Sequence, residues 1–490
     1  MDKNRYLFTR KHEAAPPAGP MMESLRDLGY ATETAVADII DNAIFAKAKN
    51  IKIDFLWRGH QSRVVLIDDG KGMRDDELIS AMRPGNQSPS TDRDLNDLGR
   101  FGLGLKTASL SQCRTFTVIS RMKNQQVSYW RWDLDYVTDP EEGGWTILEM
   151  AEPEDLELAE GMPQGTIVVW EQLDRIIDLS GSPSKKDFYA NAARAKRHIE
   201  MVFHRYLERG KLSIIFNGEP VKPWDPFLRA EAATQPLPEE YINNGQVRVK
   251  AYILPHRSKI SPESWTENEN RGGWNALQGF YIYRNQRLLV AADWLGLGKK
   301  MPHYKLARIM IDLPNNLDEL WQIDIKKSRA RPPYIERQHL RSIGVFAMSQ
   351  AEQVFRHRGK AVQRSMGDKF SFVWKIEEKD NQYFFRINRE HPIISQRLTG
   401  TSEGRDIEKL LRLLEETVPG PGLIAKESTL PDSQVRPFEK SPPQELIRLM
   451  KDLMGGWTGA GESITNARKR LLMTEPFSDY PQLIETLTND

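Results

Sequence analysis

The chain has 490 residues, a hydrophobic content of 39%, a charged content of 28% and a formal net charge of +1. This length predicts about three domains, and the composition is that of an ordinary globular protein. No apolar run approaches the roughly 20 residues that cross a bilayer, and the polar N-terminus lacks the apolar core of a signal peptide. The single cysteine, Cys113, excludes an intramolecular disulfide, so we expect a cytoplasmic protein without a membrane partner.

The first predicted helix carries a pair of polar side chains. An extended arm of about 20 residues leads into a helix from about Glu23 to Lys47. Asp38 and Asn42 are four residues apart and share one face of this helix, whereas apolar residues on the opposite face can seat it on a sheet. A carboxylate can orient or deprotonate a water, and a carboxamide oxygen can ligate Mg²⁺.

A predicted hairpin follows the helix and ends in a glycine-rich turn. Strands at Ile51–Trp57 and Ser62–Ile67 lead into the segment Asp68-Asp69-Gly70-Lys71-Gly72-Met73. Two glycines at alternate positions after a strand let the backbone turn sharply and approach a flat ligand closely. Asp68, at the end of the strand, can accept a hydrogen bond from an exocyclic amine.

A second glycine-rich segment follows a short helix at Asp75–Met82 and a polar stretch that suits a mobile lid. It reads Gly99-Arg-Phe-Gly-Leu-Gly-Leu-Lys-Thr-Ala-Ser109. Three glycines before a helix start offer free backbone N–H groups to phosphate oxygens, and Lys106 adds positive charge. The segment is not a P-loop, because Leu105 stands where a glycine must precede the lysine. It is not a Rossmann fingerprint either, since the glycine spacing is wrong and no strand immediately precedes it.

Further strands and helices are predicted towards the C-terminus. In the first third they are strands at Arg114–Arg121, Val127–Asp133 and Gly165–Trp170. Beyond residue 180 they are a helix at Ser184–Leu207, a hairpin around Asn217-Gly218, strands at Val247–Leu254, Gly279–Leu289 and Ala307–Leu313, a helix at Val345–Val362, strands at Phe370–Ile376 and Tyr383–Ile387, and helices at Glu445–Met454 and Ile464–Met473. Residues 326–360 carry nine lysines and arginines against two glutamates. This local excess suits phosphate contacts or a solvated helix.

Four short segments resemble, in their order and spacing, the nucleotide site of the GHKL ATPases, the group that contains DNA gyrase B, a heat-shock chaperone, sensor histidine kinases and MutL. They are Asp38-x-x-x-Asn42, Asp68-x-Gly70-x-Gly72, Gly102-x-Gly104 with Lys106, and Gly165-Thr166. The stretches IIDNA, DDGKGM and GRFGLGLKTAS look most similar to MORC-type and MutL-like ATPases, including bacterial forms associated with restriction systems.

The resemblance covers about residues 21–175 and implies an α+β fold class. An arm at 1–20 would precede a Bergerat-fold ATPase α/β sandwich at 21–180. A ribosomal-S5-like β/α transducer domain would follow at 181–340. Residues 341–490 would form a smaller mixed, mostly helical C-terminal α/β region, in which we recognise no catalytic motif.

The resemblance also implies a role for each matching residue. Asp68 would bind the adenine amine and Thr166 would support the adenine side through water. Asn42 would hold Mg²⁺ against the phosphates of ATP. The floor of the pocket would be shaped by Gly70, Gly72 and Met73. The lid over the β- and γ-phosphates would comprise Gly99, Gly102, Leu103, Gly104, Lys106 and Thr107.

Catalytic roles follow from the same resemblance. Asp38 stands where the family usually has a water-activating glutamate. Since aspartate is one methylene shorter, the base would reach about 1 Å less, which favours slow hydrolysis. Asp41 is a neighbouring carboxylate and a second candidate base. A transducer domain of this kind sends one lysine to the γ-phosphate, and Lys326 and Lys327 occupy a similar position, with Lys327 slightly favoured.

The function that these implications favour is an ATP-gated clamp. ATP binding would close the lid and drive homodimerisation. The dimer would capture DNA through basic patches, or proteins from the same operon, in a restriction, phage-defence or repair-like system. The alternatives are a heat-shock-type chaperone and a nucleotide-sensing regulatory subunit with little turnover. A histidine kinase needs a phosphoacceptor histidine on an upstream helical hairpin, and His12 lies in a segment too short for one.

Overall fold

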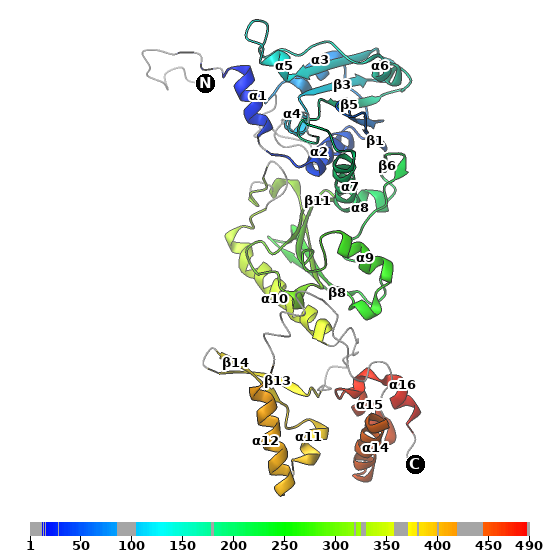
Figure 1. Ribbon diagram of the computed structural model, residues 1–490, viewed down its shortest axis with the longest axis vertical. Helices are drawn as coiled ribbons and strands as arrows, with labels where there is room; N and C mark the ends of the chain where they lie inside the picture. The colour runs from blue at the N-terminus through cyan, green and yellow to red at the C-terminus, as the bar shows by residue number, and fades with distance from the viewer. Residues whose placement is uncertain are drawn as a thin grey trace. The chain divides into compact units, whose positions relative to one another are not determined.

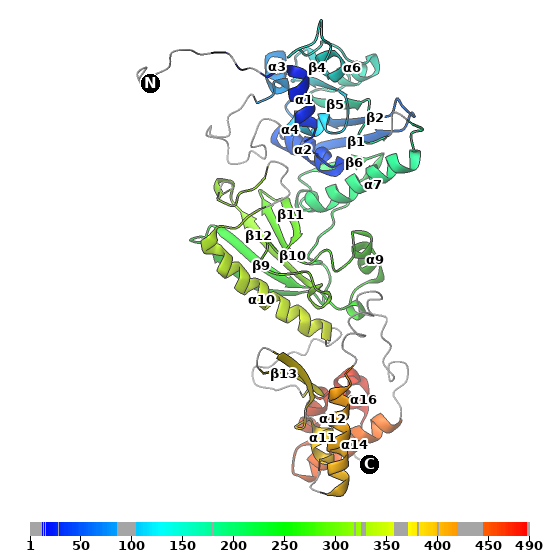
Figure 2. The same ribbon diagram turned by 60° about the vertical axis from the view of Figure 1, so that its left-hand side comes forward.

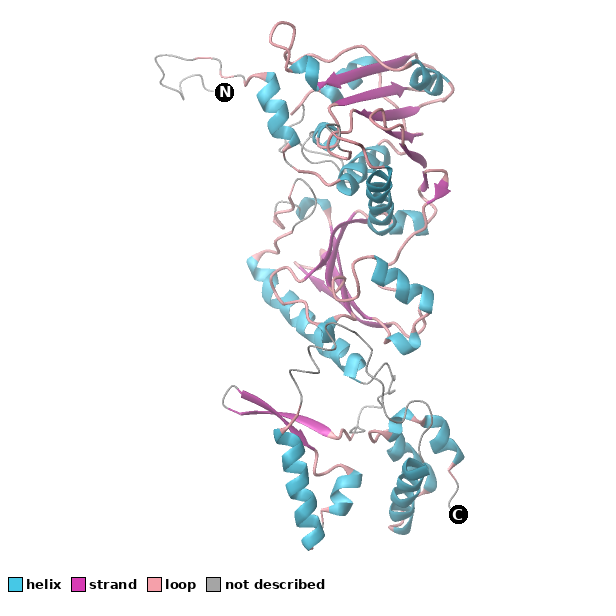
Figure 3. Cartoon of the chain, in the orientation of Figure 1, coloured by secondary structure: helices cyan, strands magenta, loops and turns pink. Residues whose placement is uncertain are grey.

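The computed structural model describes residues 12, 14, 16–27, 29–85, 104–177, 181–317, 320–324, 330–356, 371–379, 382–398, 401–418 and 444–487. The chain divides into two compact units, Met1–Leu254 with Pro262–Glu352, and Pro255–Ser261 with Gln353–Asp490. Helices and strands mix in both units (Figures 1 and 3), which confirms the expected α+β class. Among the described helices, none is long and apolar enough to span a membrane.

The first unit begins with a seven-stranded mixed sheet in the order β4-β3-β5-β2-β1-β6-β7. Its strands are β1 (Asn50–Leu56), β2 (Arg63–Asp68), β3 (Thr115–Arg121), β4 (Val127–Asp133), β5 (Gly165–Glu171), β6 (Ser213–Phe216) and β7 (Glu219–Pro220). β6 runs parallel to β1, so the sheet extends beyond residue 180. In the antiparallel pair of β2 with β5, Asp68 lies opposite Thr166.

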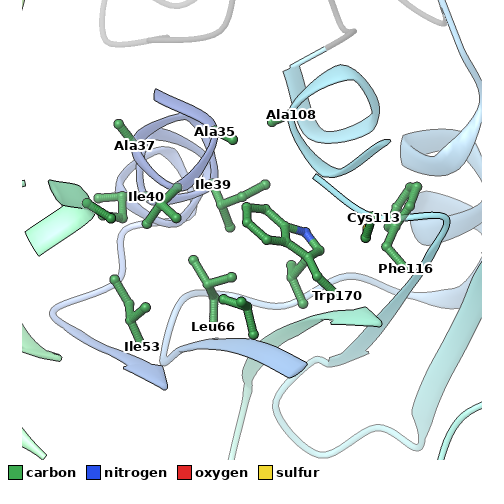
Figure 4. Packing of buried hydrophobic residues seen from close by; sticks show 14 of the residues in the cluster. Ala35, Ala37, Ile39, Ile40, Ile53, Leu66, Ala108, Cys113, Phe116 and Trp170 are labelled. Atoms are coloured by element: carbon green, nitrogen blue, oxygen red, sulfur yellow. The ribbon is translucent and has the colours of Figure 1, made fainter. Parts of the chain in front are cut away.

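Helices cover one face of this sheet and form the main core with it. They are α1 (Ala18–Arg26), α2 (Thr32–Phe45), α3 (Asp75–Met82), α4 (Gly104–Leu110), α5 (Leu134–Val137) and α7 (Lys185–Val202). Figure 4 shows Ile39 and Ile40 of α2 directed at Leu66 and Trp170 of the sheet. Burying an isoleucine side chain of this kind contributes about 2–3 kcal/mol, which fixes α2 on the sheet. The opposite face is covered by the short helix α6 (Pro153–Glu160).

Two of the predicted helices are divided in the structure. The helix expected at Glu23–Lys47 is wrong as one element, because α1 ends at Arg26 and α2 begins at Thr32. Gly29 lies between them with φ of +68°, a left-handed conformation that ends a helix and that glycine adopts without strain. Similarly, the helix expected at Ser184–Leu207 is divided into α7 and α8 (His204–Glu208).

A second sheet of five strands follows in the same unit, in the order β11-β10-β12-β9-β8. Its strands are β8 (Gln235–Ile242), β9 (Val247–Ile253), β10 (Gly279–Arg284), β11 (Arg287–Asp293) and β12 (Ala307–Leu313). The sequence did not predict β8, and the single strand expected at Gly279–Leu289 is the hairpin of β10 and β11. A short helix, α9 (Pro262–Asn270), precedes β10.

Helix α10 (Tyr334–Arg356) lies along the five-stranded sheet (Figure 2). A methyl group on Gly344 would lie 3.6 Å from the ring of Phe280, so the helix backbone comes close to β10. The expected start at Val345 is wrong by eleven residues. Two prolines at positions 332 and 333 precede the helix, where their fixed φ and missing N–H groups are tolerated.

The second unit is built from one hairpin and short helices. The hairpin pairs β13 (Trp374–Lys379) with β14 (Gln382–Ile387). The second strand agrees with the expected one to within one residue, whereas the first begins four residues later than expected. The helices are α11 (Pro392–Arg397), α12 (Ser402–Glu416), α14 (Gln444–Gly459), α15 (Ile464–Leu472) and α16 (Pro481–Thr486). An apolar core joins α14, α15 and α16 around Met450, Leu453 and Leu471. Helix α12 was not predicted from the sequence.

Candidate nucleotide-binding site

The Asp68 carboxylate lies at the end of β2, in the strand pair with β5. Its Oδ1 accepts a hydrogen bond of 2.8 Å from the backbone N–H of Gly70. Burial raises the pKa of Asp68 to about 6, although the Gly70 hydrogen bond acts in the opposite direction. One oxygen of this partly buried carboxylate is thus hydrogen-bonded to the backbone. The second oxygen can accept a hydrogen bond from a ligand.

The adjacent Asp69 has a different role. Its Oδ1 accepts from the backbone N–H groups of Lys49 (2.7 Å) and Asn50 (2.9 Å), and its Oδ2 accepts from the Asn50 side chain (2.7 Å). Partial burial raises the pKa of Asp69, but these hydrogen bonds outweigh burial and lower it overall. Asp69 therefore ties the turn to the start of β1, and Asp68 is the carboxylate that remains for a ligand.

Gly72 brings the turn against strand β3. Its φ is +69°, and a Cβ at this position would lie 2.0 Å from the carbonyl oxygen of Arg121. No side chain fits there, so the sequence pattern Asp-x-Gly-x-Gly reflects both a left-handed backbone conformation and a close approach. Met73, the next residue, packs partly buried against the main core.

A hydroxyl network links the glycine turn to Thr166. The Oγ of Ser120, on β3, lies 3.0 Å from Thr166 Oγ1 and accepts a 2.9 Å hydrogen bond from the backbone N–H of Met73. Ser120 is only 1% exposed. Ser120 thus joins the two predicted residues Met73 and Thr166. The sequence analysis missed Ser120 because a lone serine in a buried strand carries no pattern.

Asp38 is 4% exposed on α2 and faces the start of α4. The Tyr30 hydroxyl, placed by the break between α1 and α2, is hydrogen-bonded to the Asp38 carboxylate and to Thr107. Burial, and next the charge of Asp38, raise the pKa of Tyr30 well above its usual range. A methyl group on Gly104 would lie 3.7 Å from Asp38 Oδ2. Asp38 therefore lies near Gly104 and Thr107, which come from a different predicted segment.

Asn42 lies one turn after Asp38 and is exposed. Within the described residues its carboxamide has no hydrogen-bond partner, so its oxygen is available to a ligand. A neutral oxygen donor beside a buried carboxylate fits the preference of Mg²⁺ for oxygen ligands and retained waters. We therefore find that the side chains at this end of α2 suit a magnesium ion held between protein and phosphate.

Lys106 is directed towards α3. Its Nζ donates a 2.8 Å hydrogen bond to the carbonyl oxygen of Ala81, near the C-terminal end of that helix, where a cation is favourable. Burial lowers the pKa of Lys106 to about 8. Its expected contact with phosphate stays a prediction.

Several predicted site residues lie outside the described residues: Gly99, Gly102, Leu103, Lys326 and Lys327. Burial is the main cause of the raised pKa of Tyr30, and the charge of Asp324, two residues before Lys326, adds to it. The roles of the two lysines stay predictions.

Asp41, the second candidate base, is ion-paired. Its two carboxylate oxygens lie 3.0 and 2.9 Å from Nε of Arg287, the first residue of β11. A carboxylate engaged by a buried guanidinium is a poor proton acceptor, which favours Asp38 over Asp41 as the base. The sequence analysis missed Arg287 and Tyr30, because their proximity to α2 depends on how distant segments pack.

One further cluster has the composition of a metal site. His204, Glu208 and Asp225 place ligand atoms within 4.8 Å of one another. However, Arg229 donates to Glu208 and to Asp225 at 2.8 Å each, and His204 Nδ1 lies 2.7 Å from Glu208. Because a guanidinium already balances both carboxylates, we assign no metal to this cluster.

Comparison with known proteins relates this site to an ATPase family. Residues 30–165 match the sequence profile of the histidine kinase-, DNA gyrase B- and HSP90-like ATPases. The matched segment contains α2, the glycine turn with Asp68 and α4, and it ends at Gly165.

Two curated proteins are similar to part of the chain. ATPase morc-1 of Caenorhabditis elegans is 31% identical over 88 residues, covering 18% of this chain and 10% of that protein. The DNA mismatch repair protein MutL of Thermus aquaticus is 31% identical over 113 residues, covering 22% of this chain and 21% of that protein. The chain thus spans a tenth to a fifth of the length of these relatives.

Proposed function

Because this chain is a GHKL ATPase related to MORC and MutL proteins, we propose that it binds ATP with Mg²⁺ between α2, the Asp68 turn and α4 and hydrolyses it slowly. The observation that carries this proposal is the convergence of Asp38 and Thr107, from two separate segments, on the Tyr30 hydroxyl. The side chains divide into an adenine end and a phosphate end.

At the adenine end, the free oxygen of Asp68 accepts a hydrogen bond from the exocyclic amine. The Ser120 and Thr166 hydroxyls, 3.0 Å apart, fix the adjacent backbone and offer partners to a bridging water. Gly72 has no room for a side chain against the backbone of β3, so glycine there keeps the turn, and Asp68 before it, close to the strand that carries Ser120.

At the phosphate end, the Asn42 oxygen would hold Mg²⁺, which when bound neutralises phosphate charge. Asp38 orients the attacking water and takes its proton, with the Tyr30 hydroxyl holding the carboxylate in place. The Gly104 backbone lies beside Asp38 without a side chain between them. A base that is one methylene shorter than glutamate supports slow turnover.

Replacing Asn42 with alanine tests the assignment of the phosphate end. We expect Mg-ATP affinity to fall at least about 30-fold, because one oxygen ligand of the ion is lost while the helix keeps its packing. The measurement is isothermal titration of ATP with and without Mg²⁺. Glu33→Ala, in the first turn of the same helix, is the matched control. Undiminished Mg-dependent binding by Asn42→Ala would contradict the assignment.

The wider role that we propose is a nucleotide-gated, dimerising clamp in a DNA-related system. Its support is the relationship to MORC and to a DNA mismatch repair protein, together with a second sheet in the same unit that contacts α2 through Arg287. A chaperone or a sensing subunit would use the same ATP site.

Gel filtration with light scattering tests the clamp. We expect a monomer without nucleotide and a dimer with a non-hydrolysable ATP analogue and Mg²⁺, because the bound nucleotide stabilises the closed state. Added circular DNA should co-elute only with the dimer. A mass that does not change with nucleotide would refute the clamp, and a dimer that retains an unfolded protein but no DNA would favour the chaperone.

A further inference from the structure

Helix α2 buries two carboxylates close together. Asp38 and Asp41 are three residues apart and are 4% and 2% exposed. Like charges at this spacing lie on neighbouring parts of one helix face and repel each other, more strongly in a buried setting. A nearby cation offsets this repulsion and the cost of burying the two charges.

The cation comes from the second sheet. Arg287 begins β11 and is itself 3% exposed. Its Nε contacts both oxygens of Asp41 at 3.0 and 2.9 Å, and its Nη2 lies 4.0 Å from Asp38 Oδ1. Its Nη1 donates to the Leu288 carbonyl oxygen at 2.7 Å, which fixes the guanidinium plane. One side chain from a distant segment therefore lies against both carboxylates.

The hairpin that carries Arg287 is anchored at its turn. Asn285 and Gln286 have φ values of +47° and +71°, so the two strands are joined by a tight two-residue turn. The Tyr206 hydroxyl donates a 2.5 Å hydrogen bond to the Asn285 carbonyl oxygen. The nearby His198 does not supply a competing charge, since burial, and next the charge of Arg287, lower its pKa to about 3. The position of the guanidinium thus follows the position of the hairpin.

We propose that Arg287 is a positioning residue for ATP hydrolysis, through which the seating of the β10–β11 hairpin controls the arrangement of Asp38. This inference rests on the proposed function, because it takes Asp38 as the group that acts on water. Arg287 acts through Asp41 and Asp38 and does not touch the nucleotide. Withdrawal of the hairpin would remove the Arg287 guanidinium from both buried carboxylates, so nucleotide state and hairpin position bias each other reciprocally.

The experiment compares four variants of the full chain with the wild type: Arg287→Met, Arg287→Lys, Asp41→Asn and the double variant Asp41→Asn/Arg287→Met. Arg248→Met is the matched control, because Arg248 pairs with Asp312 at 2.7 Å on the same five-stranded sheet. For each protein we measure kcat, KM, the affinity for a non-hydrolysable ATP analogue and the thermal midpoint.

Arg287→Met is expected to lower kcat at least about tenfold while analogue affinity changes less than about threefold, because the base is misplaced and the binding groups are not. The kcat of Arg287→Lys should lie between those of the wild type and Arg287→Met, since lysine keeps the positive charge but lacks the planar guanidinium that contacts both oxygens of Asp41. The double variant removes both buried charges, so it should recover the thermal midpoint of the wild type but not its kcat. Arg248→Met should match the wild type in kcat.

Two results would overturn the inference. One is a kcat for Arg287→Met equal to that of Arg248→Met. The other is a double variant that recovers kcat together with the thermal midpoint, since the pair would then be merely structural. The wild-type measurements distinguish a failure of the positioning role of Arg287 from a failure of the proposed ATPase function. A wild type that neither binds nor hydrolyses ATP removes the proposed function itself, whereas an active wild type with an equally active Arg287→Met removes only the positioning role.

Discussion

Replacing Asp68 with asparagine is expected to abolish ATP binding and to stabilise the nucleotide-free protein at pH 7.5. The Gly70 N–H donates to Asp68 Oδ1 at 2.8 Å, so the asparagine carbonyl oxygen will keep that contact. The asparagine NH₂ group then takes the place of Oδ2 and meets the adenine amine, another donor. Two facing donors replace a charge-assisted hydrogen bond, and we expect a loss of affinity of about 100-fold or more.

The gain in stability follows from the direction of the Asp68 pKa shift. Burial raises this pKa from 3.8 to about 6 in the folded protein. The folded state therefore binds more protons than the unfolded state between these values. The stabilisation is fully present below about pH 4 and is lost as the pH rises through 6. Asparagine does not ionise, so Asp68→Asn should be more stable than the wild type at pH 7.5 by up to about 3 kcal/mol, and by about 1 kcal/mol at pH 4.5.

Urea unfolding at the two pH values and calorimetric titration with ATP measure both effects. Asp69→Asn is the control, because its expected change in stability at pH 7.5 has the opposite sign. The pKa of Asp69 is lowered by its hydrogen bonds to Asn50 and Lys49, so the ionised form stabilises the fold above the ordinary aspartate pKa. Asp69→Asn should therefore be less stable than the wild type at pH 7.5. Retained ATP affinity in Asp68→Asn, or a loss of stability at pH 7.5, would show that Asp68 is not the buried adenine acceptor.

The parts of the site that the sequence predicted depend on short-range geometry. Asp38 and Asn42 share a helix face because of the helical period, and the position of Asp68 follows from where an alternating strand ends. The glycines at 70 and 72 predicted a close backbone approach to a flat ligand, and the approach that the structure shows at Gly72 is to the Arg121 carbonyl oxygen of β3. These inferences need only the local chain and its period.

The parts that were missed depend on packing between distant segments. Arg287 is 246 residues from Asp41 in sequence, and an arginine after a turn reads as solvated. Tyr30 reaches the site only because the helix is interrupted at Gly29. The apolar pattern of the sequence had favoured one continuous helix from Glu23. Ser120 contributes through a register between β3 and β5 that no single segment specifies. The positions of Arg287, Tyr30 and Ser120 in the site all depend on tertiary packing.

Replacing Asp38 with alanine is expected to lower kcat about 100-fold or more while leaving ATP affinity almost unchanged, because a general base contributes to the transition state and little to ground-state binding. Tyr30 will then lose its carboxylate partner, and Tyr30→Phe serves as a control for that loss. Single-turnover hydrolysis and analogue binding measure the two quantities separately.

Asp38→Glu tests whether reach limits the rate. Glycine at 104 leaves no side chain opposite the carboxylate, and even a methyl group there would stay 3.7 Å from Asp38 Oδ2. If the Asp38 carboxylate is the base and its reach limits the rate, the added methylene brings it closer to the attacked phosphate, and we expect kcat to rise about tenfold. If glutamate, aspartate and alanine at this position give one rate, Asp38 is no base. If glutamate is slower than aspartate but alanine is slowest, Asp38 is the base and Tyr30, not the missing methylene, sets its working position.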